Sequence, residues 1–212
     1  MPRCLDALMP SLPKPIIGLI GGIGAGKSAV ARVLGELGCF VVNSDDLARE
    51  ALCDPAVHKT LVQWWGEGIL APDRRIDRRS VARIVFARPA ERERLESLVH
   101  PWIEKRRLAM FKTAPDEAPA LVIDAPLLIE AGVDRQCDAV IFVEADRSRR
   151  LARLAEKRGW SEQEMNQREE SQLPLDAKRI RADYVIDNNG DLQSLTGQVR
   201  RTLREIVQSH RR

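Results

Sequence analysis

The chain has 212 residues, of which 44% are hydrophobic and 31% are charged, and this composition is ordinary for a globular protein. The 34 basic and 31 acidic residues leave a net charge of +3, which is too small to indicate nucleic-acid binding by itself. No apolar run approaches the roughly 18 residues that a membrane span needs, and Cys4, Cys39, Cys53 and Cys137 show no disulfide or zinc-site spacing. We therefore expect a cytoplasmic protein with free thiols and with neither a membrane nor a nucleic-acid partner.

The first segment, Met1 to Pro15, holds four prolines and lacks the apolar core of a secretory signal. We expect residues 1–14 to form a flexible N-terminal extension without a chemical role. Residues 15–212 are long enough for one α/β domain that contains an inserted subdomain.

The stretch Gly21–Ser28 follows a predicted strand, Ile16–Ile20, and precedes an amphipathic pattern of helical spacing. It matches the G-x-x-x-x-G-K-[ST] signature of phosphate-binding loops in the strand, loop and helix context that the signature requires. Glycines at 22, 24 and 26 allow backbone conformations that side chains exclude, so successive N–H groups can face phosphate oxygens. We expect Lys27 to contact the β- and γ-phosphates of ATP and Ser28 to ligate Mg²⁺. The expected nucleotide-binding residues of the loop are Gly22, Ile23, Gly24, Ala25, Gly26, Lys27, Ser28 and Ala29.

The next predicted strand, Phe40–Val42, ends in the polar cluster Asn43-Ser44-Asp45-Asp46. Ligands of open parallel sheets bind at the carboxyl ends of the strands. Asp45 could therefore accept a hydrogen bond from an acceptor hydroxyl and orient or deprotonate it. The alternative is that Asp45 or Asp46 only caps a helix that begins near Leu47.

A long helical region, residues 47–118, is expected next, because no strand pattern occurs between Leu47 and Thr113. Its stretch from Asp73 to Arg94 has eight arginines against four acidic residues. His100 precedes a proline that predicts a helix start, so His100 is either a helix boundary or a substrate contact. An insertion of this length indicates a substrate-binding region. The expected breaks between its helices are Asp54-Pro55, Ala71-Pro72, Arg88-Pro89 and His100-Pro101.

Continuous apolar runs after this region predict strands that are buried on both faces, as in a parallel sheet covered by helices. Asp124 ends the first of these strands, and it is either a Mg²⁺-directed carboxylate or a residue that caps a turn. The pattern from Leu192 to Ile206 predicts a closing amphipathic helix. The three runs are Ala120–Ile123, Ala139–Val143 and Tyr184–Ile186.

A basic run from Arg147 to Arg158 carries six basic residues and one acidic residue. Arg149, Arg153 and Lys157 fall on one helical face, which could close over a triphosphate as a lid and neutralise its charge. A solvated basic face is the alternative. The position directly after a strand, at the ligand-binding edge of the sheet, favours the lid.

A loop that holds a nucleoside triphosphate does not identify the group that receives the phosphate. The N-K-x-D sequence with which GTPases of this class read guanine is absent. A helical insertion favours a small-molecule kinase, which must enclose its acceptor and exclude water. The alternative is an ATPase switch whose insertion binds a protein or nucleic acid, although aromatic residues are not interleaved with the arginines as nucleic-acid binding would favour.

Taken together, these motifs resemble the dephospho-CoA kinase family, from about Ile16 to Val207. The most specific part is a P-L-L-x-E segment combined with a later A-D-x-x-x-x-N segment. The sequence departs from the family at Ile20, Ala29 and Asn43, and Asn43, where aspartate is frequent, leaves Asp45 as the single candidate base at its strand end. The matching motifs are Ile20–Ser28, Asn43–Asp45 with Ala48 and Arg49, His100-Pro101, Asp124–Glu130, Arg153 with Arg158, Gln172, and Ala182-Asp183 with Asn188.

The resemblance implies a P-loop nucleoside-triphosphate hydrolase fold of the nucleoside-monophosphate-kinase type. This α/β fold has a parallel five-stranded sheet flanked by helices, a helical acceptor-binding insertion and a lid. The core would comprise residues 15–46, 119–146 and 183–212, the insertion residues 47–118, and the lid residues 147–182. The implied reaction is the last step of coenzyme A biosynthesis, the ATP- and Mg²⁺-dependent phosphorylation of the ribose 3′-hydroxyl of dephospho-CoA, by a monomer or small homo-oligomer.

The resemblance also implies roles for individual residues. Asp45 would act on the acceptor hydroxyl, and Asn188 would lie beside the adenine of ATP. Asp124 would join Ser28 at the metal. The other catalytic residues would be Lys27, Arg153 and Arg158, the last two in the lid, and the other acceptor-binding residues would be Arg49, His100, Leu127 and Glu130.

Overall fold

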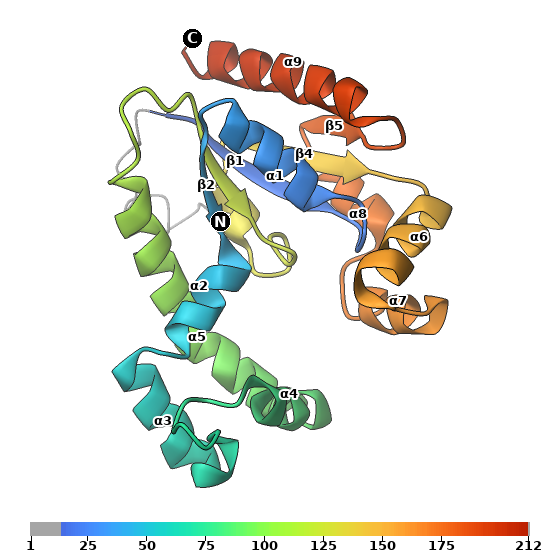
Figure 1. The fold of residues 1–212 in the computed structure, drawn as a ribbon. Helices are drawn as coiled ribbons and strands as arrows, with labels where there is room; N and C mark the ends of the chain where they lie inside the picture. Colours follow the sequence, from blue (N-terminus) through green and yellow to red (C-terminus); the bar gives the residue numbers. More distant parts are fainter. Residues whose placement is uncertain (1–13, 212) are drawn as a thin grey trace, which may run out of the picture. The chain divides into compact units, whose positions relative to one another are not determined.

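A computed structural model describes residues 14–211, so the expected N-terminal extension lies outside the described residues except for Lys14. A five-stranded sheet forms the centre of the fold, in the order β2-β3-β1-β4-β5 (Figure 1). The pairs of β1 with β3 and β4, and of β4 with β5, are parallel, which confirms the predicted parallel α/β architecture. The strands are β1 (Ile16–Gly21), β2 (Phe40–Asn43), β3 (Leu121–Asp124), β4 (Ala139–Glu144) and β5 (Tyr184–Asp187).

The chain divides into a core unit, which runs up to Val42 and resumes at Ala114, and a helical unit, Asn43–Thr113. Two helices of the core unit, α1 and α9, pack on one face of the sheet (Figure 1). The helices of the core unit are α1 (Lys27–Glu36), α6 (Arg147–Arg158), α7 (Glu162–Glu169), α8 (Leu175–Ile180) and α9 (Leu192–His210), with the short 3₁₀ helix η2 (Val133–Gln136).

The central strand β1 is buried along its whole length, and this explains why its sequence is continuously apolar. On one face, Ile17 and Leu19 pack with Val30 and Leu34 of α1 and with Val199 of α9. Burial of this kind contributes about 1.5–3 kcal/mol for each large aliphatic side chain. The core therefore fixes β1, and with it the start of the loop that follows.

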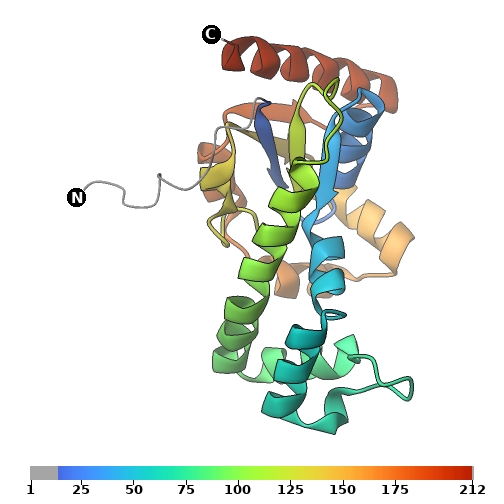
Figure 2. The same ribbon diagram turned by 90° about the vertical axis from the view of Figure 1, so that its left-hand side faces the viewer.

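The helical unit has its own apolar core, built by Val57, Leu61, Ile69, Val81 and Val99. Within this unit, the long helix α5 packs against α2 and α4, and Figure 2 shows α2 running beside it. The unit contains α2 (Ser44–Ala51), α3 (Pro55–Trp65), the 3₁₀ helix η1 (Glu67–Ile69), α4 (Arg78–Ala87) and α5 (Pro89–Phe111).

Helix α5 corrects one prediction from the sequence. Pro55 and Pro89 do start helices, but α5 continues through Pro101 without ending. An internal proline removes one backbone hydrogen bond and costs about 3 kcal/mol, so it normally ends a helix. Tertiary contacts just after the proline hold α5 in place: Trp102 Nε1 donates to Asp54 over 3.0 Å, and Arg106 pairs with Glu50 at 2.8 Å.

Three of the four cysteines lie in the described residues, and Cys4 lies outside them. Cys39, Cys53 and Cys137 form no disulfide in the described part of the chain, and burial raises the pKa of Cys39 to about 12. Within residues 14–211, the helices lack the combination of length and apolar character that a bilayer crossing requires.

Candidate active site

The predicted phosphate loop connects β1 to α1, and its backbone depends on glycine. Gly24 and Gly26 have φ angles of 77° and 97°, which side-chain-bearing residues rarely adopt. A Cβ on Gly26 would lie 2.1 Å from Nδ2 of Asn188, so the position also lacks space for a side chain. Gly22 was expected to need the same backbone freedom, but its φ is not positive; the reason for glycine here is steric, because a Cβ would lie only 2.9 Å from Nη1 of Arg150.

The start of α1 directs positive charge at the loop. Gly26 is the N-cap of α1 and offers no capping side chain, and α1 presents the positive end of its dipole at this point. Nζ of Lys27 donates to the carbonyl oxygens of Gly21 over 3.1 Å and of Gly22 over 3.4 Å, which places the ammonium beside the first residues of the loop. This arrangement suits a polyphosphate.

Two of the expected nucleotide-binding residues, Ala25 and Ala29, donate backbone hydrogen bonds to other residues of the loop. The N–H of Ala25 donates to the Gly22 carbonyl over 3.1 Å, and the N–H of Ala29 donates to Gly26 over 2.9 Å in the first turn of α1. These bonds hold the turn of the loop and the start of the helix. Ala25 and Ala29 therefore shape the loop through their amides.

Arg153 and Asn188 brace the loop from the α6 and β5 sides. Nη1 of Arg153 donates to the carbonyl oxygen of Ala25 over 3.1 Å, and Nη2 donates to the backbone carbonyl of Asn188 over 2.7 Å. The buried side-chain amide of Asn188 donates to the same Ala25 oxygen over 2.7 Å. Two residues selected from the sequence thus meet at the phosphate loop, more than 120 residues along the chain from it.

Arg158, the other arginine expected in the lid, contacts an aromatic ring. Its guanidinium carbon lies 4.9 Å from the centre of the Trp160 ring, and that of Arg168 lies 4.1 Å from the same ring. Cation–π contacts of this kind stabilise by about 0.5–1 kcal/mol at exposed sites. The structure therefore places Arg153 at the loop and Arg158 on Trp160.

Asp45 lies in the first turn of α2, directly after the end of β2. The sequence left open whether Asp45 or Asp46 caps this helix, and the N-cap is in fact Asn43. The Asn43 side-chain oxygen accepts hydrogen bonds from the backbone N–H groups of Asp45 over 2.8 Å and of Asp46 over 3.2 Å. Because Asn43 satisfies these donors, the exposed Asp45 carboxylate has no capping role.

Two further candidates lie on the surface of the helical unit. Arg49, on α2, donates to the carboxylate of Asp46 over 2.6 Å, and its side chain is 55% exposed. His100 is exposed on α5. Both side chains are accessible to a ligand.

The residues expected at Mg²⁺ lie at the ends of adjacent core elements. Asp124 is the last residue of β3, pairs in register with Leu19 of β1, and is 6% exposed. Ser28 is exposed in the first turn of α1. A hydroxyl and a carboxylate are hard oxygen donors of the type that Mg²⁺ prefers, so this pair fits the ion chemically.

Glu130 pairs with a buried lysine, Lys178 of α8. The ammonium of Lys178, whose side chain is 1% exposed, lies 2.9 Å from Oε1 of Glu130 and donates to Gln172 over 2.9 Å. Oε1 of Glu130 also accepts from the N–H of Leu173 over 2.9 Å. Burial acts to raise the pKa of Glu130, but the Leu173 and Lys178 contacts outweigh it and hold this pKa below its usual value.

Comparison with known proteins assigns the chain to a family. A family model for dephospho-CoA kinase matches residues 15–194. The chain belongs to the dephospho-CoA kinase family. The dephospho-CoA kinase of Geobacter metallireducens is 43% identical over 199 residues, which are 93% of this chain and 99% of that protein.

Solved structures show the same fold, that of the dephospho-CoA kinases. TT1252 from Thermus thermophilus has a TM-score of 0.78 and 35% sequence identity, and the match covers 91% of this chain and 97% of that chain. Dephospho-CoA kinase from Campylobacter jejuni has a TM-score of 0.68 and 22% identity, with 92% and 98% covered. The second likeness shows the fold alone.

One residue beside the phosphate loop of this dephospho-CoA kinase family member was not selected from the sequence. Arg150 is 5% exposed, and its Nη1 donates to the carbonyl oxygen of Ile23 over 3.3 Å. The sequence placed Arg149, Arg153 and Lys157 on one helical face; Arg149 and Lys157 are exposed, whereas the neighbouring Arg150 is buried. A signal was present, because Arg150 lies one helical turn before the buried Leu154 and therefore on the inward face.

Proposed function

We propose that this chain transfers the γ-phosphoryl group of ATP to the ribose 3′-hydroxyl of dephospho-CoA, giving coenzyme A and ADP. One observation carries the proposal: in a member of this family, the Lys27 ammonium lies beside the first residues of a phosphate loop. Arg153 and Asn188 hold that loop through the Ala25 carbonyl. Catalysis of phosphoryl transfer depends on positioning of the two substrates and on electrostatic stabilisation of the transition state, and the protein itself takes part in little covalent chemistry.

The donor side follows from the loop. Its glycine backbone and the N-terminus of α1 hold the triphosphate, and the Lys27 ammonium neutralises charge on the β- and γ-phosphates. Arg153 keeps the loop in place through the Ala25 carbonyl and adds positive charge nearby. Asn188 would contact the adenine side while holding the same carbonyl.

The acceptor side is assigned to the helical unit and to the turn after β3. Asp45 accepts the proton of the ribose hydroxyl, or orients that hydroxyl, because its carboxylate is exposed and is not used for capping. Arg49 and His100 bind the acceptor, with Leu127 and Glu130 from the turn after β3. The arginines of α6, including Arg158, belong to a lid formed by residues 147–182.

Ser28 and Asp124 would hold Mg²⁺ together with the phosphates of ATP. When bound, the ion neutralises the charge that develops between the β- and γ-phosphates. We also propose that the protein works in the cytoplasm as a monomer or small homo-oligomer.

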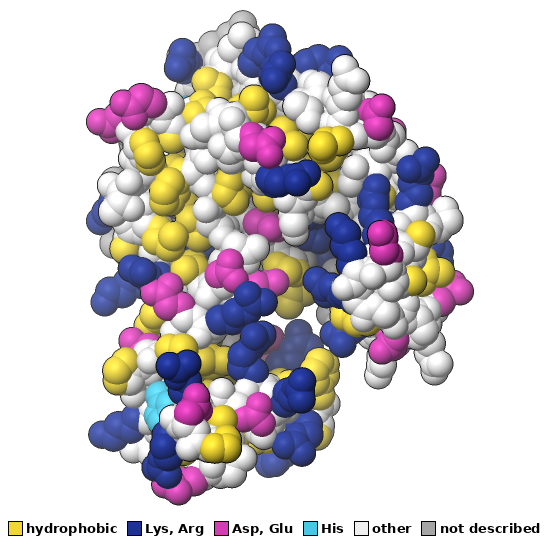
Figure 3. Space-filling model, viewed as in Figure 1, with side chains coloured by type: hydrophobic (Ala, Val, Ile, Leu, Met, Phe, Trp, Pro, Cys, Tyr) yellow, Lys and Arg dark blue, Asp and Glu magenta, His cyan; other side chains and the backbone are white. Residues whose placement is uncertain are grey.

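The rival function, an ATPase switch that binds a protein or nucleic acid, is not supported by the family. The arginine-rich stretch of the helical unit also has internal partners: Arg74 pairs with Glu67 at 3.0 Å, and Arg92 pairs with Glu96 at 2.9 Å. Figure 3 shows Lys and Arg side chains interspersed with Asp and Glu over this unit. Such a surface differs from the unbroken basic face that binds nucleic acid.

A coupled assay for ADP release tests the proposed reaction. The purified chain is given ATP and Mg²⁺ with dephospho-CoA, AMP, adenosine or shikimate in parallel. We expect ADP release that depends on dephospho-CoA, with a product that carries a new phosphate on the 3′-oxygen by ³¹P NMR. ADP release that is equal without any acceptor, or that is faster with another acceptor, would contradict the proposal.

A further inference from the structure

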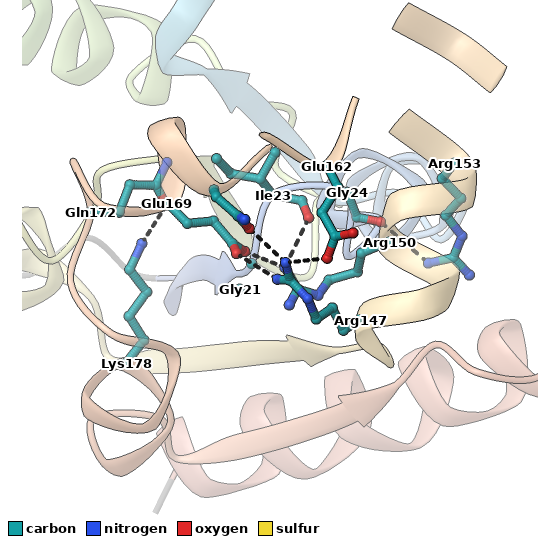
Figure 4. Close-up of polar contacts among 12 residues, drawn as sticks. Gly21, Ile23, Gly24, Arg147, Arg150, Arg153, Glu162, Glu169, Gln172 and Lys178 are labelled. Atoms are coloured by element: carbon teal, nitrogen blue, oxygen red, sulfur yellow. Dashed lines mark hydrogen bonds and ion pairs between the residues drawn. The ribbon is translucent and has the colours of Figure 1, made fainter. Parts of the chain in front are cut away.

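Arg150 links three segments of the core unit. Its Nη1 donates to the carbonyl oxygen of Ile23 in the phosphate loop over 3.3 Å, and it forms an ion pair with Glu169 of α7. Figure 4 shows the guanidinium between these two partners. Arg150 itself lies on α6, so one side chain joins the loop to both helices that follow β4.

The phosphate loop is shaped around this part of α6. A Cβ on Gly22 would lie 2.9 Å from Nη1 of Arg150, and a Cβ on Gly24 would lie 2.7 Å from the backbone oxygen of Arg150. Neither loop residue could carry a side chain without displacing α6 or the guanidinium. The loop and Arg150 therefore fit each other closely.

Glu169 holds the Arg150 guanidinium from the opposite side. Glu169 is also 3.4 Å from Arg147, but Arg147 has other partners, Glu162 at 2.9 Å and Asn166 at 2.5 Å, and its side chain is 46% exposed. Arg150 is buried, and Glu169 is the carboxylate with which it pairs. The orientation of Arg150 therefore depends on Glu169.

An arginine at this position carries a cost in stability. A buried guanidinium loses its hydration, and an apolar side chain of similar volume is frequently as stable in such a place. Nε of Arg150 is also buried, with no hydrogen-bond partner among residues 14–211. Packing alone would not favour arginine here, whereas an apolar side chain could not donate to the Ile23 carbonyl.

We propose that Arg150 is a positioning residue, which holds the phosphate loop in its binding shape through the Ile23 carbonyl, and that Glu169 fixes Arg150 for this task. The inference rests on the proposed function, since it takes the loop as the site of ATP. Displacements of about 1 Å in such a loop are costly to phosphoryl transfer, so its support affects nucleotide binding and turnover together. Helix α7 is thereby coupled to the nucleotide site.

The test measures the Kd for ADP by calorimetry, because this readout does not require any acceptor. Arg150→Met removes the donor and keeps an unbranched stem close to that of arginine, and Glu169→Gln keeps the Arg150 donor and removes the negative charge that anchors it. We expect the Kd to rise about tenfold or more in Arg150→Met and about threefold or more in Glu169→Gln. Glu162→Gln, which also loses a pair with Arg147, and Arg204→Met, an exposed change on α9, should stay within about twofold of wild type.

A charge exchange separates positioning from stability. The double variant R150E/E169R keeps two opposite charges but has no donor at position 150 for the Ile23 carbonyl. We expect its Kd for ADP to stay about tenfold raised, whichever way its Tm differs from that of Arg150→Met. A Kd that returns to the wild-type value together with the Tm would show that the pair is only structural, and an unchanged Kd in Arg150→Met would also overturn the proposal.

Amide hydrogen exchange gives a readout that does not need an Arg150 variant to fold. In the full chain, exchange of the peptide that covers residues 21–28 should be about threefold faster or more in Glu169→Gln than in Glu162→Gln. Equal rates would overturn the proposal. A wild-type chain that binds ADP but does not phosphorylate dephospho-CoA would count against the proposed function and leave these comparisons valid.

Discussion

The side-chain amide of Asn188 donates to the carbonyl oxygen of Ala25 over 2.7 Å, and this bond ties the end of β5 to the phosphate loop. Arg153 completes a closed set of bonds, because its guanidinium donates to Ala25 over 3.1 Å and to the backbone carbonyl of Asn188 over 2.7 Å. The loop is thus held by α6 and by the segment after β5. Both supports can be tested by mutation.

Asn188→Ala should weaken nucleotide binding. The change removes one of the two side-chain donors to the Ala25 carbonyl, the other being Arg153, and the loss of such a hydrogen bond costs about 0.5–1.5 kcal/mol. If most of this cost appears in binding, the Kd for ADP rises by up to about tenfold. The control is Asn189→Ala, since Asn189 bonds to Asp146 and Asp187 and has no bond to the loop. Equal affinities in the two variants would show that Asn188 does not support the loop.

Gly26→Ala should abolish useful nucleotide binding. Gly26 has φ at 97°, and a Cβ there would lie 2.1 Å from Nδ2 of Asn188, so the loop or Asn188 must move. We expect kcat/KM for ATP to fall by about a hundredfold or more. Gly197→Ala is the matched control, because among residues 14–211 nothing beyond the adjacent backbone of α9 lies within 4 Å of its added Cβ, and alanine favours the helix by about 1 kcal/mol. Normal turnover in Gly26→Ala would contradict this reading of the loop.

The sheet and the loop could be predicted because their determinants are local. The strand before Gly21 is apolar without interruption, and the glycines and Lys27 follow at fixed spacing. The helix through Pro101 could not be predicted, because contacts distant in sequence, such as Trp102 with Asp54, outweigh the local signal of a proline. A prediction from local sequence fails where tertiary contacts stabilise a conformation more than the local residues disfavour it.

The same distinction applies to the site. Arg153 and Asn188 were selected through resemblance, and the structure brings both to the Ala25 carbonyl. Arg150 was not selected, since a run of arginines does not itself show which of them face inward. Nor did the sequence indicate that Glu130 would have a buried lysine, Lys178, as its partner. Such pairings become visible only when the fold places them together.

Lys178→Met should destabilise the protein by about 1–3 kcal/mol, because it leaves the partly buried Glu130 carboxylate without its charged hydrogen-bond partner. Urea unfolding measures the effect as a lower midpoint. Adding Glu130→Gln removes the remaining charge and should recover a large part of the loss, since the amide oxygen can still accept from the N–H of Leu173. A double variant no more stable than Lys178→Met would argue against a charge effect.

The same pair predicts a dependence of stability on pH. The folded pKa of Glu130 is lowered from its ordinary 4.5 by the Leu173 and Lys178 contacts, against the opposing effect of burial. A lowered carboxyl pKa contributes stability that is present above pH 4.5 and is lost as the pH falls through the folded value. Urea midpoints at pH 7 and near pH 4 should therefore differ less in Glu130→Gln than in wild type. An equal difference in both proteins would rule out this contribution.

Asp45→Asn should lower kcat by about a hundredfold or more while the Kd for ADP stays within about twofold. A positioned general base contributes about 10²–10⁴ in rate, and the amide cannot accept the hydroxyl proton. The cap of α2 is untouched, because Asn43 accepts from the N–H groups of residues 45 and 46. Asp46→Asn is the matched control: it removes an equal charge from the same helical turn, together with the pair to Arg49. Turnover that falls equally in both variants would assign the effect to the charge of the helix terminus, and unchanged turnover in Asp45→Asn would remove Asp45 from the mechanism.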